Sequence, residues 1–292
     1  MKRLTVAAVC VLAAVVMAAA QVLKPVPLDD VAKMGVLIGD RLTAQPVKPR
    51  KVLVFWRCEG YVHGEAIEYG NKALEMAAQQ AKAFDVAFSC DYRSLTDKKT
   101  LMSYDALVLN NTTHLNTKGH PALAVNLLDF VREGRGLCVI HAGADSFYGS
   151  PEVAELIGGL FDGHPWNAQG DWAFKLDEPG HVLNRAFGGQ GFKAGDEIYQ
   201  QKTPPYDRAK LRVLVSLDFS DAATAKAKGQ KRADNDYAVS WVRPYGKGRV
   251  FYTSFGHDKR TYLERARLWH ILDGLQYTLG DLKADDQPAA RK

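Results

Sequence analysis

The segment Gly136-Leu137-Cys138-Val139-Ile140-His141-Ala142-Gly143-Ala144-Asp145 decides the fold of this protein. The apolar run before His141 is typical of a parallel strand that is buried on both faces of a sheet. His141 follows at the position where a sharp strand-to-helix turn presents a side chain above the carboxyl edge of an α/β sheet. Asp145 lies four residues further on, close enough to orient His141 or to share a cation with it. The segment therefore predicts an α/β fold and the centre of its functional site.

Alternating strand and helix patterns lie on both sides of this segment. Apolar runs predict strands over residues 52–55, 86–90, 106–109, 172–176, 211–217, 238–242 and 250–254. Helical spacing of apolar residues predicts helices over residues 65–83, 121–133 and 268–279. We therefore expect one α/β domain, a flavodoxin-like parallel sheet flanked by helices, with additional β-strands in the C-terminal half.

Composition excludes several classes of protein. The chain has 292 residues, of which 47% are hydrophobic and 24% charged, as in a soluble globular protein. The formal charge of +5 is spread evenly along the chain, whereas a nucleic-acid groove would need a clustered basic face. We expect neither a nucleic-acid partner nor a nucleotide cofactor.

The first twenty residues have the features of a secretory signal peptide. Lys2 and Arg3 precede an apolar stretch over residues 4–16, and small residues follow at 18–20. The apolar stretch is shorter than a membrane span of about 20 residues. We predict a signal peptide over residues 1–20, an N-terminal arm over 21–50, the α/β domain over 51–280 and a flexible tail over 281–292. The mature protein is expected to be periplasmic or secreted, with no membrane span.

Three cysteines remain after signal cleavage, and none lies in a metal-binding CxxC pair. In an oxidising compartment, Cys58 and Cys90 are the pair to test for a disulfide. The alternative is that Cys90 and Cys138 are small core residues within strands.

Polar residues gather after the predicted strands, where α/β sheets bind ligands. His63 follows the first strand, His141 the fourth and His257 the last, and His164 lies in a loop before a proline. Histidines and carboxylates supply general acids, general bases and metal ligands. The expected catalytic residues are His141, His63, Asp145 and Glu197, and the expected metal ligands are His63, His141, His164 and His257. The expected substrate contacts are Tyr61, Asn111, Thr112, Trp166 and Tyr199.

The same segments carry a resemblance to a known family. In chain order they are Gly60-Tyr61-Val62-His63, Asn111-Thr112-Thr113, residues 136–145, Gly158-Gly159-Leu160-Phe161-Asp162-Gly163-His164-Pro165, Asp196-Glu197-Ile198-Tyr199 and residues 245–257. Over residues 51–280 they resemble the ThuA-like (trehalose utilisation) family of the class I glutamine amidotransferase-like superfamily. The resemblance implies a flavodoxin-like fold and carbohydrate metabolism, often through 3-keto-glycosides. Glutaminase chemistry is not expected, because His141 stands where those enzymes carry cysteine.

The leading hypothesis is therefore an exported enzyme that processes a small carbohydrate, such as a 3-keto-glycoside, by acid–base chemistry with a divalent metal. The alternative is a non-catalytic sugar-binding or accessory protein that uses the same cleft. A third interpretation is a partner-docking module whose polar loops do not converge. Self-association as a homo-oligomer also stays open. The enzyme hypothesis requires His63, His141, His164 and His257 to meet in one cleft.

Overall fold

The computed structural model describes residues 23–289 and contains one mixed nine-stranded sheet. The strands are β1 (Lys51–Phe55), β2 (Asp85–Ser89), β3 (Ala106–Asn110), β4 (Gly136–Ile140), β5 (Asp171–Leu176), β6 (Phe192–Gly195), β7 (Arg212–Leu217), β8 (Ala238–Tyr245) and β9 (Gly248–Thr253). The α-helices are α1 (Leu28–Ile38), α2 (Gly64–Ala81), α3 (Arg93–Thr96), α4 (Lys98–Leu101), α5 (Pro121–Arg132), α6 (Pro151–Ile157), α7 (Ala222–Ala225), α8 (Lys259–Tyr262) and α9 (Arg265–Leu279). Three short 3₁₀ helices complete the order, namely η1 (His141–Ala144), η2 (Val182–Phe187) and η3 (Arg208–Lys210).

The strands follow the order β2-β1-β3-β4-β9-β8-β7-β5-β6 across the sheet. The first five are parallel, and β8, β7, β5 and β6 continue the sheet in antiparallel pairs. The order reverses between β1 and β3, which is the switch point where flavodoxin-like sheets bind ligands beyond their carboxyl ends. The predicted parallel α/β sheet with extra C-terminal strands is confirmed.

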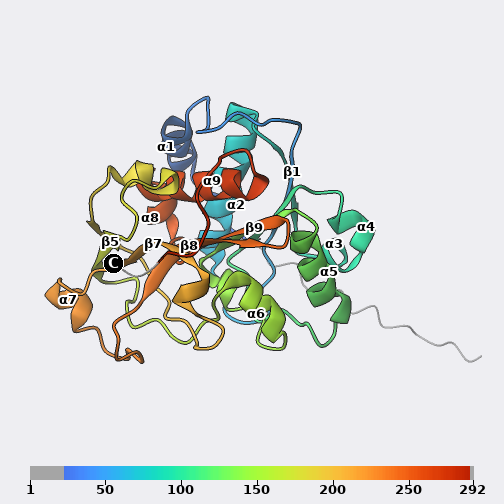
Figure 1. Ribbon diagram of the computed structural model, residues 1–292. Coiled ribbons are helices and arrows are strands. Elements are labelled where there is room, and N and C mark those ends of the chain that lie inside the picture. The colour runs from blue at the N-terminus through green and yellow to red at the C-terminus, as the bar shows by residue number, and fades with distance from the viewer. Residues whose placement is uncertain (1–22, 290–292) are drawn as a thin grey trace, which may run out of the picture.

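Helices cover both faces of the parallel strands (Figure 1). Alternate residues of β1 show how the core is divided, because Val52 and Val54 pack with α2 and α9, whereas Leu53 and Phe55 pack on the opposite side with α5. The parallel strands therefore bury side chains on both faces, which explains their continuous apolar runs.

The two flanking segments pack against the domain. Helix α1 buries Met34 and Ile38 in the core, although this region is predicted only as an arm. Residues 281–287, predicted as part of the tail, also make contacts with the domain. Asp281 accepts a hydrogen bond from Arg50 Nε at 3.0 Å, and Asp285 pairs with Arg212 at 2.6 Å. These charged contacts hold a segment whose polar sequence alone suggests a loose end.

The predicted signal peptide lies outside the described residues. Among residues 23–289, no helix combines the length and the apolar character needed to cross a bilayer.

The three cysteines among residues 23–289 are free thiols in the structure, without a Cys58–Cys90 disulfide. Cys58 donates a hydrogen bond from Sγ to the carbonyl of Asn111 at 3.2 Å. Cys138 is completely buried within β4, and burial raises the pKa of its thiol. Cys138 is therefore a core residue and not a nucleophile.

His270 of α9 makes part of the core sensitive to pH. Its ring is fully buried, with Nδ1 2.8 Å from the Leu183 carbonyl and Nε2 2.7 Å from Ser240 Oγ. Burial lowers the pKa of His270 to about 4, against 6.5 for an exposed imidazole. Below pH 6.5 the unfolded chain therefore binds a proton that the folded chain excludes, and stability falls until the pH reaches the folded pKa.

We predict that His270 accounts for about 3 kcal/mol of the stability lost between pH 7.5 and pH 4.5, at 1.36 kcal/mol per pH unit. Urea unfolding of the wild type and of His270→Gln at both pH values measures this contribution. The variant is expected to lose less stability than the wild type over this range. Equal losses in the two proteins would contradict the assignment.

Candidate functional site

Loops from the carboxyl ends of the parallel strands meet at one edge of the sheet. The loop after β1 carries His63, the turn after β4 carries His141, and the loop after β9 carries His257. Glu197 joins them from the segment that follows β6. Each of these four residues offers one ligand atom, and all four atoms lie within 4.8 Å of one another. We call this set the four-residue centre.

The distances inside the four-residue centre are those of ligands around one ion. His257 Nδ1 lies 3.3 Å from His141 Nε2 and 3.4 Å from Glu197 Oε1, and His141 Nε2 lies 3.7 Å from Glu197 Oε1. Two ligands bound at about 2.1 Å to a tetrahedral ion lie about 3.4 Å apart. The His63 ring centroid is 5.2 Å from those of His141 and His257.

The tautomer of neutral His141 follows from its hydrogen bond. His141 Nδ1 lies 2.7 Å from the main-chain carbonyl oxygen of Ser254, which can only accept a hydrogen bond. Nδ1 therefore carries the hydrogen, and Nε2 directs a lone pair toward Glu197 and His257. Lone pairs facing each other at these distances need a proton or a cation between them.

Burial keeps the other two imidazoles neutral. Burial and the nearby His141 and His257 lower the pKa of His63 to about 2, and His63 Nδ1 has no hydrogen-bond partner among the described residues. Burial, together with the nearby His141, also lowers the pKa of His257. An unpartnered nitrogen in a buried, neutral imidazole is available to a metal ion.

Glu197 supplies the negative charge. Burial by itself raises the pKa of Glu197, but His141 and the other surrounding histidines lower it by more, so the net pKa lies below its ordinary value. Three neutral imidazoles and one carboxylate form the nitrogen and oxygen ligand set used for Zn²⁺, Fe²⁺ and Mn²⁺. The residues present therefore fit a divalent transition metal.

The backbone at His141 is unusual. Its φ is +47°, in the left-handed region that residues other than glycine rarely adopt. Such conformations cluster at functional sites, where surrounding contacts hold them in place. Gly256, beside His257, also has a left-handed φ of +115°, and a Cβ there would lie 2.8 Å from Ile140 Cγ2. Both turns direct a histidine to the same edge of the sheet.

Asp196 positions two of the four ligands, a role that the sequence analysis missed. Its buried carboxylate accepts hydrogen bonds from the main-chain N–H groups of Glu197 at 2.9 Å and of Gly256 and His257 at 3.2 Å. It also accepts one from Thr261 Oγ1 at 2.6 Å. The adjacent acidic pair was the only signal in the sequence, and it does not tell which acid faces the site.

His164 lies at the exposed rim of the centre. Its Nδ1 is 3.4 Å from Glu197 Oε2, the oxygen that faces away from the other histidines, and its side chain is 48% exposed. His164 is predicted as a metal ligand, but the structure places it outside the four-residue centre. Glu197, predicted as a catalytic carboxylate, occupies the fourth position.

Asp145 makes different contacts from those predicted. It is expected to orient His141, but among the described residues its carboxylate accepts a hydrogen bond from the Tyr148 hydroxyl and pairs with His114 Nε2 at 3.4 Å. The Ser254 carbonyl orients His141 instead. Burial raises the pKa of Asp145. Asp145 thus belongs to a neighbouring group that includes His114, which the sequence did not single out.

The predicted substrate contacts differ in exposure. Tyr61 is 70% exposed, and its ring packs edge-to-face with the His63 ring at a centroid distance of 4.7 Å. Tyr199 packs its ring 4.3 Å from that of His141 but is itself buried. Asn111 and Thr112 are also buried.

Trp166 requires a correction. Its side chain is completely buried, its ring packs edge-on against Tyr237, and Nε1 donates to the Thr224 carbonyl at 3.0 Å. The ring therefore has no free face for a sugar. Core packing explains this tryptophan, as it does most others.

The parallel sheet, with the four-residue centre beyond the carboxyl ends of its strands, defines a flavodoxin-like α/β protein. The ThuA family, described as trehalose utilisation, matches residues 51–278, so the chain belongs to this family. A protein from Bacteroides uniformis described as ThuA-like matches with a TM-score of 0.63 and 18% identity, over 81% of this chain and 94% of that chain. A ThuA-like protein from Parabacteroides merdae matches with a TM-score of 0.55 and 16% identity, over 80% of this chain and 90% of that chain. The comparison with curated proteins gives no match.

We predict that Asp196→Asn lowers the affinity of the protein for Zn²⁺ or Co²⁺ by about 10–100-fold, the usual effect of removing a group that orients metal ligands. Isothermal titration and Co²⁺ absorption spectra measure the affinity, and circular dichroism checks the fold. Asp273→Asn is the matched control. Asp196 is buried and pairs with Arg267 at 3.4 Å, and Asp273 is likewise buried and pairs with Arg185 at 3.1 Å but does not contact the centre. Equal affinities in the two variants would contradict a positioning role for Asp196.

Proposed function

We propose that this ThuA-family protein is an enzyme that cleaves 3-keto-glycosides, with a divalent metal held by His63, His141, Glu197 and His257. The observation that carries the proposal is the convergence of these four side chains beyond the sheet. The family description, trehalose utilisation, supports a carbohydrate substrate. The position of His141, where amidotransferases need a cysteine, argues against glutaminase chemistry.

A ketone at C3 of a sugar makes this cleavage chemically accessible. The carbonyl acidifies the hydrogen on C2, so a base of moderate strength can remove that proton. The electron pair left on C2 then forms a double bond to C1 and expels the oxygen substituent there. The expelled oxygen takes up a proton, so the products are an alcohol and an unsaturated ketone. A bound divalent cation would supply positive charge that stabilises the enolate oxygen.

His164 is the proposed proton carrier. Its imidazole is half exposed at the rim of the centre and contacts Glu197 through Nδ1, so Nε2 is the nitrogen that faces substrate when Nδ1 donates to the carboxylate. In this role Nε2 takes the proton from C2 and returns it to the departing oxygen. A positioned acid–base group of this kind contributes typically about 10²–10⁴-fold to rate.

We predict that the purified protein consumes a 3-keto-disaccharide but not the unoxidised parent sugar, and that a chelator abolishes the activity. His141→Ala is expected to lose both bound metal and turnover, whereas His164→Ala keeps its metal and loses about 10²-fold or more in turnover. His181→Ala is the control, because His181 binds the Asp285 carbonyl away from the centre. Metal content is measured by elemental analysis.

The opposite outcome separates the two main hypotheses. Saturable binding of the oxidised sugar without turnover, in protein fully loaded with metal, would identify a sugar-binding or accessory protein. Turnover that is unchanged by both His141→Ala and His164→Ala would place the chemistry elsewhere in the molecule.

We also propose that the protein is exported, on the basis of the charged, apolar and small-residue pattern of residues 1–20. Periplasmic or secreted protein is expected to begin near Gln21. Intact mass spectrometry of that fraction checks the cleavage, and a mass that still includes residues 1–20 would reject it.

A further inference from the structure

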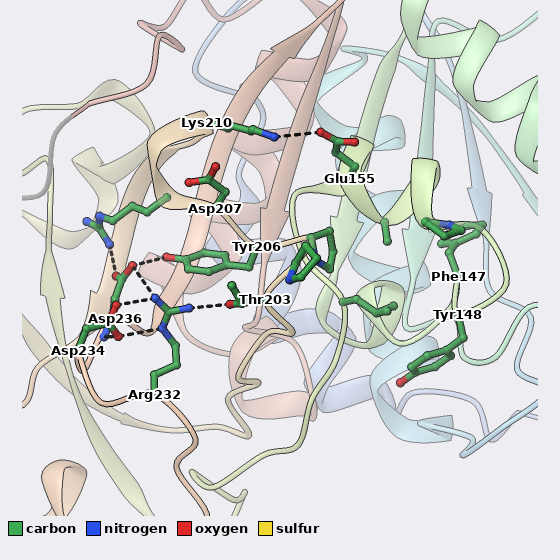
Figure 2. Close-up of a pocket in the computed structure, with 16 residues that line it drawn as sticks. Phe147, Tyr148, Glu155, Thr203, Tyr206, Asp207, Lys210, Arg232, Asp234 and Asp236 are labelled. Atoms are coloured by element: carbon green, nitrogen blue, oxygen red, sulfur yellow. Dashed lines mark hydrogen bonds and ion pairs between the residues drawn. The ribbon is translucent and has the colours of Figure 1, made fainter.

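The structure contains a cavity that the proposed metal site does not use. It has a volume of about 840 Å³, within the range of cavities that hold small ligands. Figure 2 shows Phe147 and Tyr148 on one side, Tyr206 and Arg232 on the other, and the Lys210–Glu155 pair at the rim. No residue of the four-residue centre lines this cavity.

Three chain segments connect the centre to the cavity. One runs from His141 to Tyr148, one from His164 back to Leu160, and one from Tyr199 to Thr203. The segments are also joined to one another, because Phe161 pairs with Gln201 in a β-bridge and its N–H donates to the Ala144 carbonyl at 3.1 Å. Leu160 lines the cavity, and the ring centroid of the next residue, Phe161, lies 4.4 Å from that of Tyr199, which in turn lies 4.3 Å from that of His141. Two successive ring contacts therefore separate the edge of the cavity from the centre.

Tyr148 links the cavity to the group that borders the centre. It lines the cavity, and its hydroxyl donates a hydrogen bond to Asp145, four residues after His141. A ligand that rests against Tyr148 is therefore held next to the polar group that borders the centre.

The charges around the cavity favour a neutral ligand. Each of its cationic side chains is already paired with a carboxylate, since Arg208 lies 2.7 Å from Asp236, Arg232 2.6 Å from Asp234 and Lys210 3.2 Å from Glu155. A phosphate or carboxylate ligand would find no excess positive charge here. These pairs still present donors and acceptors at the rim.

Most of the remaining lining is apolar, apart from Thr203 and Asp207. Leu160, Pro204 and Pro205 contribute hydrocarbon surface to it. A sugar ring combines C–H faces that pack on such surface with hydroxyl groups that bond to carboxylates and guanidinium groups. The lining therefore matches a neutral sugar better than it matches an anion or a purely apolar molecule.

We infer that this cavity is the subsite for the leaving sugar of a disaccharide whose oxidised ring occupies the four-residue centre. The reaction in this inference rests on the proposed function, whereas the assignment of a neutral sugar as the ligand rests on the residues that line the cavity. The cavity would then determine specificity. Contacts in the cavity would raise kcat/KM most for disaccharides and little for glycosides with a small leaving group.

The test fills the cavity from its rim. Glu155→Trp on helix α6 introduces a large ring at an exposed lining position, and Glu152→Trp makes the same change at an exposed position of the same helix that does not line the cavity. Glu155→Trp is expected to lower kcat/KM for 3-keto-trehalose by about tenfold or more, equivalent to 1.4 kcal/mol of lost binding. It should leave kcat/KM for methyl 3-keto-glucoside and the metal content unchanged. Parallel losses on both substrates, or equal behaviour of the two variants, would overturn the inference.

A binding measurement separates this inference from the proposed function. Calorimetric titration of the wild type with trehalose requires no turnover, and binding is expected to be lost in Glu155→Trp and kept in Glu152→Trp. That result without any cleavage of keto-sugars would support the subsite and reject the proposed reaction. No saturable trehalose binding, or tighter binding of glucose 6-phosphate at the same place, would overturn the assignment of a neutral sugar.

Discussion

The buried carboxylate of Asp196 joins two parts of the sheet that strand pairing leaves far apart. β6 lies at the outer edge of the sheet, four places from β9 in the strand order. Glu197, which follows β6, stands beside His257, which follows β9, because the chain returns from the edge and Asp196 binds the N–H groups of both loops. The hydrogen bond from the Tyr199 N–H group to Ser254 Oγ, at 2.9 Å, supports the same approach. The parallel strands bring the three histidines together by topology, whereas the position of Glu197 depends on these contacts across the sheet.

Strand topology explains how much of the site could be predicted from the sequence. His63, His141 and His257 each follow an apolar run, and parallel strands with their carboxyl ends at one edge must place such residues near one another. The sequence could not show which residues of the loops before β5 and after β6 turn inward. Glu197, expected as a catalytic carboxylate, lies within the four-residue centre, whereas His164, expected as a metal ligand, lies at its rim. Asp145 was assigned to a histidine that a main-chain carbonyl orients instead.

Errors elsewhere have the same origin, because burial depends on contacts between segments distant in the chain. Trp166 follows a loop motif, and its aromatic ring is of the kind that stacks on sugars. Thr224 and Tyr237, which lie more than fifty residues away in the chain, enclose that ring. The C-terminal segment is polar in sequence, and its carboxylates are held by Arg50 and Arg212. The spacing of apolar residues predicts which face of a helix or strand is buried. It does not predict an ion pair between segments that are distant in the chain.

The left-handed turn at His141 combines local backbone strain with a residue of the four-residue centre. Glycine adopts this conformation without the steric penalty that a β-carbon brings, so replacement of His141 by glycine relieves backbone strain while it removes one member of the four-residue centre. The same replacement also removes a fully buried ring and leaves the Ser254 carbonyl without its donor, so the relief of strain is set against lost packing and a lost hydrogen bond. The contacts that hold His141 in a strained turn are therefore the same contacts that hold its ring in the four-residue centre.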